Sequence, residues 1–196
     1  MKHLSVKKIA TSVARAEDVP ALLDAQGVEF QPIDCVDWAA DYPYAPKVEF
    51  RIAHKGDAVL IEYRVSEQSV AAVAPHDNGR VWEDSCCEFF FKPEGGNVYY
   101  NVETNCAGTV LVGCGETREA REAAPAEVLG AISRWSSLGR TPFAERIEPT
   151  TWHMALIIPT GTAFHSQIAT LDGARMKANF YKCGDKLQTP HFLSWN

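Results

Sequence analysis

The sequence has no long hydrophobic run and no excess of positive charge. A membrane-spanning helix needs roughly 18 or more consecutive apolar residues, and no such stretch occurs. The net charge is −6, whereas a nucleic-acid-binding surface requires a basic face. We therefore expect neither a membrane nor a nucleic acid as the partner of this protein.

Motifs that bind nucleotides or activate a catalytic group are also missing. There is no G-x-G-x-x-G, no P-loop and no alternation of strands with long helices, which argues against nucleotide-binding folds. No nucleophile elbow surrounds Ser85, and no two histidines have the i, i+4 spacing of a catalytic metal site. Asp77, Asn78 and Asp84 could supply oxygen ligands to a structural calcium ion, although a plain Asx turn is the favoured explanation. No other cofactor is expected.

The N-terminal residues are partly basic but lack the apolar core of a signal peptide, so we expect a cytoplasmic protein. The six cysteines contain no C-x-x-C pair, which leaves no pattern for a structural zinc ion. Adjacent Cys86 and Cys87 must point to opposite faces of a strand and cannot join the same core. We predict that most of the cysteines are buried free thiols.

The chain of 196 residues is 46% hydrophobic, which is enough for one sizeable core, and we expect a single domain over residues 1–196. Short runs of alternating polarity recur along it at fairly even spacing. Val48–His54 and Ala58–Ser66, joined by a short turn, predict one hairpin, and 151–158 and 175–181 predict further strands. Residues 18–27 predict a short helix that ends at Gly27. The pattern is typical of an all-β fold, an antiparallel β-sandwich of jelly-roll or immunoglobulin-like type with few short helices.

The most informative stretch runs from Val81 to Gly108. Two strand-like runs, Cys86–Lys92 and Val98–Cys106, flank a glycine-containing turn and predict a second hairpin. Side chains alternate between the two faces of a strand. The apolar face comprises Cys87, Phe89, Phe91, Val98, Tyr100 and Val102. The opposite face carries Glu88, Asn101, Glu103 and Asn105, which is either a polar sheet surface or a binding site.

Three kinds of side chain in this stretch suit the recognition of a sugar. Trp82 lies between Arg80 and an acidic pair at the start of a strand, and an exposed indole offers a flat face to the C–H groups of a pyranose. A tryptophan packed under a loop is the alternative. The carboxylate of Glu88 can accept hydrogen bonds from two hydroxyls, and the amides of Asn101 and Asn105 can both donate and accept.

The same residues carry a resemblance to a known family. The runs Trp82–Ser85, Glu88–Phe90 and Tyr99–Asn101, followed by Glu103, Asn105 and Gly108, resemble the family 9 carbohydrate-binding modules, and especially stand-alone family-9-like proteins. The closing runs 178–182 and 191–195 extend the similarity, which covers about residues 33–195. The resemblance implies a β-sandwich that binds sugars without cleaving them. It also implies that an aromatic residue at Trp82 stacks on the sugar and that Glu88 contacts its hydroxyls.

Family members hold their ligand between two aromatic rings, and we expect Trp195 to be the second ring, with Tyr181 and Trp152 as rivals. The predicted function is non-catalytic binding of a mono- or oligosaccharide in carbohydrate catabolism. The predicted sugar-binding residues are Trp82, Glu88, Asn101, Glu103, Asn105 and Trp195. One alternative is a glycoside hydrolase that uses paired carboxylates among Glu83, Asp84, Glu88 and Glu103. The other is a protein-interaction sandwich whose polar face is only surface.

Overall fold

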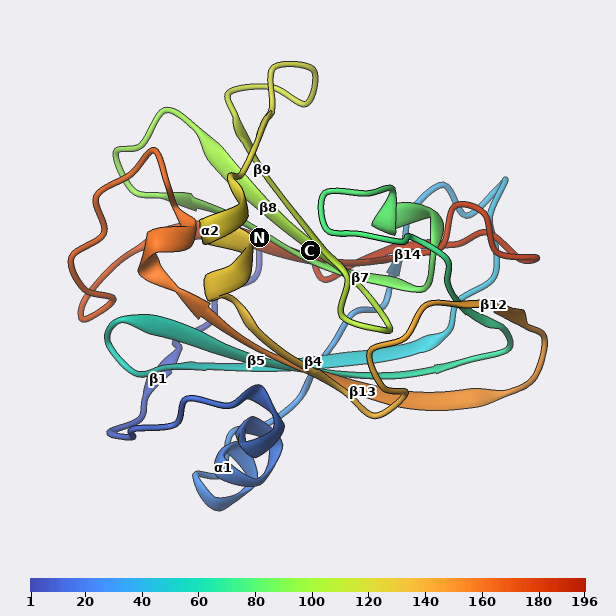
Figure 1. Ribbon diagram of the computed structural model, residues 1–196, viewed down its shortest axis with the longest axis horizontal. Coiled ribbons are helices and arrows are strands. Elements are labelled where there is room, and N and C mark those ends of the chain that lie inside the picture. The colour runs from blue at the N-terminus through green and yellow to red at the C-terminus, as the bar shows by residue number, and fades with distance from the viewer.

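The computed structural model describes residues 1–196 and consists of two β-sheets that pack face to face (Figure 1). Sheet A has the order β1-β4-β5-β13-β11, with β2 paired to β4, and sheet B has the order β10-β9-β8-β7-β14-β15-β3. A separate two-stranded ribbon pairs β6 with β12. All pairings are antiparallel except that between β1 and β4. The sequence prediction of a mainly antiparallel β-sandwich with few helices is confirmed.

The bounds of the elements follow the chain. Sheet A contains β1 (Lys7–Lys8), β2 (Gln31–Pro32), β4 (Lys47–His54), β5 (Ala58–Glu67), β11 (Ser133–Ser136) and β13 (Thr150–Pro159). Sheet B contains β3 (Cys35–Val36), β7 (Cys86–Pro93), β8 (Tyr99–Asn105), β9 (Val110–Gly115), β10 (Glu122–Ala123), β14 (Met176–Cys183) and β15 (Phe192–Ser194). The ribbon consists of β6 (Val70–Ala72) and β12 (Phe143–Arg146). The helices are α1 (Val19–Ala25) and α2 (Ala126–Ala131), with short 3-10 turns η1 (Ala16–Asp18), η2 (Val81–Glu83) and η3 (Thr160–Thr162).

The core lies between the sheets and follows the alternation of the strands. On β13 the buried side chains that face the core are Trp152, Met154, Leu156 and Ile158, and on β7 they are Cys87, Phe89 and Phe91. Phe50 of β4 stacks on Phe180 of β14 across the two sheets, with ring centroids 3.6 Å apart. Burying an aromatic or large aliphatic side chain of this kind contributes about 1.5–3 kcal/mol to stability.

Helix α1 covers the outer face of sheet A (Figure 1). Its Val19 and Leu23 pack with Leu60 and Ile157 in a second apolar cluster, so the helix shields this part of the outer face of sheet A from solvent. The helix ends as predicted: Gly27 has φ 61°, and Val28 N–H donates to Leu23 O at 3.0 Å, as in a Schellman motif. Asp18 occupies the N-cap position without a capping hydrogen bond from its side chain.

Both predicted hairpins are present, since β4 pairs with β5 and β7 pairs with β8. Two further local patterns in the sequence were misleading. Residues 67–80, which carry Pro75, Asp77, Asn78 and Gly79, predict a loop, but they contain β6, which pairs with β12. The charged, alanine-rich stretch 117–129 predicts one or two helical turns interrupted by Pro125, but α2 begins directly after this proline. Pro125 is the N-cap residue in an extended conformation, a position where the missing N–H of proline costs no helical hydrogen bond.

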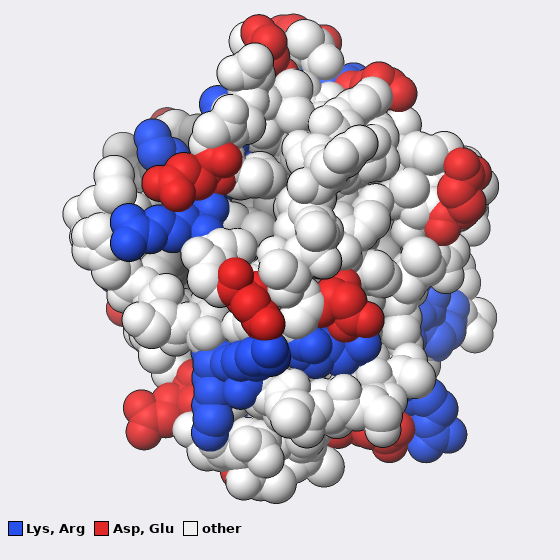
Figure 2. Space-filling model, turned by 90° about the vertical axis from the view of Figure 1, so that its left-hand side faces the viewer, with Lys and Arg blue, Asp and Glu red and all other residues white.

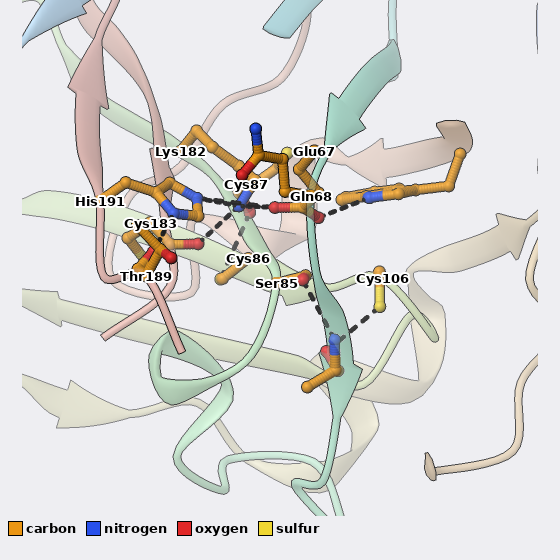
Figure 3. Close-up of polar contacts among 12 residues, drawn as sticks. Glu67, Gln68, Ser85, Cys86, Cys87, Cys106, Lys182, Cys183, Thr189 and His191 are labelled. Atoms are coloured by element: carbon orange, nitrogen blue, oxygen red, sulfur yellow. Dashed lines mark hydrogen bonds and ion pairs between the residues drawn. The ribbon is translucent and has the colours of Figure 1, made fainter. Parts of the chain in front are cut away.

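A buried polar cluster connects the two sheets at one end of the sandwich (Figure 3). The ammonium of Lys182 lies 2.9 Å from Glu67 Oε2 and 2.6 Å from His191 Nε2, and Trp152 Nε1 donates to Glu67 Oε1 at 2.7 Å. Burial and the charge of Lys182 lower the pKa of His191 to about 3, so its neutral ring accepts a hydrogen bond from the ammonium. Burial opposes the charge of Lys182, yet the carboxylate of Glu67 keeps the pKa of this lysine raised.

All six cysteines are free thiols, and five of them are buried, while Cys35 is exposed. No helix is both long enough and apolar enough to cross a membrane. On the face shown in Figure 2, acidic and basic side chains lie next to each other, and uncharged surface occupies most of the area.

Candidate functional site

The outer face of sheet B carries a pocket of about 930 Å³. Its floor comes from β7, β8, β9 and β14, and its walls come from the loop around residues 37–42, from η2 and from the segments near residues 118–121 and 185. The polar face predicted for the β7–β8 hairpin forms part of this floor. The pocket therefore lies on the sheet face that no helix covers.

Two carboxylates face each other on the floor. Glu88 of β7 and Glu103 of β8 are direct partners in the register of the two strands. Glu103 Oε1 accepts a hydrogen bond from Asn101 Nδ2 at 2.7 Å and lies 3.4 Å from Arg121 Nη1. Glu88 Oε1 accepts one from the Cys183 thiol at 3.0 Å. Asn101 is fully buried, and Gly113 on β9 is needed beside it, because a Cβ there would come within 2.6 Å of Asn101 Oδ1.

The closeness of these carboxylates changes how they ionise. Burial and the charge of Glu103 raise the pKa of Glu88 to about 8. Burial also raises the pKa of Glu103, although Asn101 and Arg121 oppose this shift. Two carboxylates that share a site do not both ionise at neutral pH, because each charge disfavours the other. The pair therefore holds a proton at pH 7, which lets it donate as well as accept a hydrogen bond.

Aromatic side chains surround the carboxylates. On the floor, Phe90 stacks on Tyr99 with centroids 6.0 Å apart and meets Tyr181 edge to face at 5.0 Å. Trp82, on η2, lines the pocket and is half-buried, and the Arg80 guanidinium carbon lies 5.9 Å from its ring centroid. The pocket thus combines flat apolar rings with hydrogen-bonding groups.

A second aromatic group stands at the rim. Trp38 and Tyr42 both meet the ring of Phe192 edge to face, at 5.2 and 4.8 Å. Trp38 is 66% exposed and has φ 52°, a left-handed conformation that is uncommon for a bulky residue. Such backbone conformations cluster at binding sites, which makes Trp38 a candidate for contact with a ligand.

The structure brings four of the six predicted site residues together: Trp82, Glu88, Asn101 and Glu103 all line the pocket. Asn105 does not, and its assignment was wrong. Its amide is fully buried, donates to Asp84 Oδ2 at 2.8 Å and accepts the backbone N–H groups of Ala107 and Thr109. With its groups engaged inside the protein, Asn105 stabilises the turn after β8 and has no group left for a ligand.

Trp195 was also wrongly assigned as the second ring. Its side chain is 6% exposed and lies in the core, edge to face with Phe50 and Phe180. The reason is alternation: Leu193 and Trp195 point inward, whereas Phe192, at the alternate position just before Leu193, points outward and lines the pocket. Trp152 lies in the core too, whereas Tyr181 lines the pocket.

Sequence reasoning missed Trp38, Tyr42 and Phe192 as pocket residues. The proline-containing stretch 31–46 predicts an ordered loop that packs across one end of the sandwich, and the available signal was Trp38 and Tyr42 next to acidic Asp37 and Asp41. The sequence offers Arg118 and Arg121 as loop residues that could reach a ligand but does not place them, and both line the pocket.

The predicted calcium ligands are already occupied by protein donors. Asp84 accepts the backbone N–H groups of Val73 and Ala74 at 2.8 and 2.9 Å. Asp77 Oδ1 lies 2.7 Å from Arg134 Nη1. The side-chain amide of Asn78 donates to the backbone carbonyl of Ala124 and accepts a hydrogen bond from the backbone N–H of Val112. The side chains that could have supplied oxygen ligands are therefore engaged by the protein itself.

A β-sandwich with a preformed pocket of aromatic rings, carboxylates and an amide on one sheet has the architecture of a carbohydrate-binding module. The sequence profile described as carbohydrate-binding family 9 matches residues 17–196, and the chain belongs to this family. It is a non-catalytic carbohydrate-binding protein, which confirms the sequence prediction and disfavours the hydrolase and protein-interaction alternatives.

Solved structures agree with this assignment. The crystal structure of a candidate carbohydrate-binding protein from Bacteroides uniformis is 55% identical, with a TM-score of 0.95 over 98% of this chain and 88% of that chain. A family 9 module from Caldicellulosiruptor kristjanssonii in complex with cellotriose shares the fold at 10% identity and TM-score 0.56, over 97% of this chain and 82% of that chain. Its complex with glucose gives 9% identity and TM-score 0.56, over 99% and 85%. No curated relative matches the sequence.

Proposed function

We propose that the pocket on sheet B binds a glucose-containing mono- or oligosaccharide. In this proposal the indole of Trp82 lies against the apolar face of a sugar ring, and Glu88 and Glu103 contact its hydroxyls. Asn101 holds Glu103 in place, and Trp38 provides the second aromatic ring.

The carboxylate pair is the observation that carries the proposal. Each carboxylate has one oxygen engaged by the protein, Oε1 of Glu88 by Cys183 and Oε1 of Glu103 by Asn101 and Arg121. Their Oε2 atoms receive no hydrogen bond from the protein, although both residues line the pocket. Neighbouring hydroxyls of a pyranose can supply the missing partners, in charge-assisted bonds that are stronger than neutral ones.

The positions of the aromatic rings support the same ligand. Trp82 and Trp38 both line the pocket, from η2 and from the loop that precedes β4. Indole rings suit the C–H face of a pyranose. A volume of about 930 Å³ accommodates more than one sugar ring.

Glucose is the proposed sugar because two solved relatives of the same fold hold cellotriose and glucose. Sugars are strongly hydrated, so the net gain per contact is small. The affinity should lie between about micromolar and millimolar, or about −8 to −4 kcal/mol.

Calorimetric titration of glucose and cellotriose tests the proposal. We expect the wild-type protein to bind at least one of them. Glu103→Gln should weaken binding at least tenfold, or about 1.4 kcal/mol, because it replaces an acceptor oxygen of the pair with a donor. The matched control is Glu127→Gln, since Glu127 is exposed on α2 outside the pocket.

Binding by the wild type that Glu127→Gln preserves and Glu103→Gln reduces supports the proposal. Equal binding by all three proteins would place the sugar elsewhere. Absence of binding for every glucose- and other hexose-based oligosaccharide tried would contradict the proposed ligand class.

A further inference from the structure

Two thiols and a carboxylate gather at one side of the pocket floor. Cys86 of β7 and Cys183 of β14 are direct partners in the strand register, and Glu88 follows two residues after Cys86 on the same face of the sheet. The two Sγ atoms and a carboxylate oxygen of Glu88 all lie within 4.8 Å of one another. Cys183 Sγ is 3.0 Å from Glu88 Oε1. Figure 3 shows both thiols near the buried polar cluster.

This spacing is close to that of ligands around a zinc ion. Zinc binds thiolates at about 2.3 Å and carboxylate oxygens at about 2.0–2.2 Å in a tetrahedral arrangement. Ligand atoms around such an ion lie roughly 3.3–3.8 Å from one another, so the three groups need to approach by at most about 1.5 Å. Thiolate ligands select zinc and similar soft cations over magnesium or calcium.

The surroundings leave the cluster available to an ion. Glu88 has no ion pair with any residue of the protein, because Arg121 is engaged by Glu103 and the ammonium of Lys182 lies beside Glu67. Apolar Ala74 and Val81 enclose the thiols on one side. Glu88 and Cys183 line the pocket on the other, which gives an ion a route in from solvent.

We propose that Cys86, Glu88 and Cys183 form a binding site for a soft divalent cation of the zinc class, with its remaining coordination position open to the pocket. The site shares Glu88 with the proposed sugar contacts, whereas its two thiols take no part in them. Two thiolates and one carboxylate would carry three negative charges, which a divalent ion largely neutralises.

Binding of the ion must release protons. A zinc-class ion binds the thiolate, whereas Cys86 and Cys183 are buried free thiols that must give up their protons when the ion binds. The apparent affinity should therefore increase with pH, by up to about 100-fold per unit where two protons are released.

Cobalt(II) is a suitable probe, because its thiolate complexes have a charge-transfer absorption band in the near ultraviolet. We expect the reduced wild-type protein to develop this band with one equivalent of Co²⁺ and to lose it when Zn²⁺ displaces the cobalt. Cys183→Ser and Cys86→Ser should abolish the band. Glu88→Gln should weaken Co²⁺ binding by at least the roughly 10–100-fold that loss of a supporting group near a metal costs.

The matched control is Cys106→Ser. Cys106 is a buried thiol that donates to Ala71 O at 3.2 Å, away from the cluster (Figure 3), and its loss should leave the band unchanged. If Cys86→Ser fails to fold, the test uses Cys183→Ser and Glu88→Gln instead. Their melting temperatures, measured alongside, show whether these variants are folded. No band in the wild type, a band that survives in Cys183→Ser, or equal loss in Cys106→Ser would overturn the inference.

Discussion

At the scale of single residues, the pocket depends on two carboxylates that are held closer than their charges favour. Strand register alone places Glu88 opposite Glu103. The hydrogen bond from Asn101 and the ion pair with Arg121 partly stabilise the negative charge of Glu103. Glu88 receives only the hydrogen bond from the thiol of Cys183. Such a pair lowers the stability of the folded protein when both carboxylates must ionise. Pairs of this kind are typical of functional sites, where they serve binding.

The first prediction concerns how the free energy of unfolding depends on pH. The pKa of Glu88 is raised from 4.5 to about 8 in the folded protein. Between these values the folded state binds more protons than the unfolded state, so the free energy of unfolding should fall as the pH rises through this window. Glu88→Gln should flatten this decline, because the amide cannot ionise. Urea unfolding at a series of pH values measures both proteins.

The same decline in stability through this pH window in the wild type and in Glu88→Gln would mean that other groups dominate the titration. A suitable control is Glu127→Gln, which removes an exposed carboxylate and should retain the decline of the wild type.

At the scale of elements, the sequence was sufficient wherever alternation was regular. The hairpins β4–β5 and β7–β8 and the strand β13 were predicted correctly, because apolar side chains at every second position must face the core. The polar outward face of β7 and β8 became the floor of the pocket for the same reason.

What the sequence could not supply is which distant segments meet. Trp38 reaches the pocket only because β3 pairs with β15 at the edge of sheet B, which places the loop at 37–42 beside Phe192. Asn105 continued the polar alternation of β8 but lies at its end, where the chain turns and the amide is needed for backbone N–H groups. Local patterns contain no information on these long-range contacts.

The second prediction separates Trp38 from Trp195 as the second ring. Trp195→Ala should destabilise the protein by about 3–5 kcal/mol, because it leaves a cavity beside Phe50 and Phe180. Trp38→Ala should change the melting temperature little, since its ring is 66% exposed, but should weaken binding of the sugar by about 1–2 kcal/mol. Thermal unfolding and calorimetry on both variants test this. Unchanged sugar affinity in Trp38→Ala would remove this residue from the site.

At the scale of the whole molecule, a buried charge joins the two sheets. Lys182 of β14 in sheet B pairs with Glu67 at the end of β5 in sheet A, and His191 and Trp152 complete the hydrogen bonds around them (Figure 3). Lys182 lies between Tyr181 and Cys183, whose side chains line the pocket on the opposite face of the strand. The cluster thus fixes β14 in the position that the pocket requires.

The third prediction concerns this cluster. Lys182→Met should destabilise the protein by about 3–5 kcal/mol, because it leaves Glu67 buried without its partner. The double variant Lys182→Met/Glu67→Gln should recover part of the loss. Denaturant unfolding at neutral pH measures both. A loss below about 1 kcal/mol in Lys182→Met would show that the pair contributes no more than an exposed ion pair.

Sugar binding through Trp82 is the central claim, and calorimetric titration of a bound sugar into Trp82→Ala tests it most directly. Trp135→Ala is the matched control, since Trp135 is a half-buried tryptophan on β11 of sheet A, away from the pocket. We predict that Trp82→Ala loses about 2 kcal/mol of binding free energy while Trp135→Ala binds as the wild type does. Full affinity in a folded Trp82→Ala protein would contradict the account.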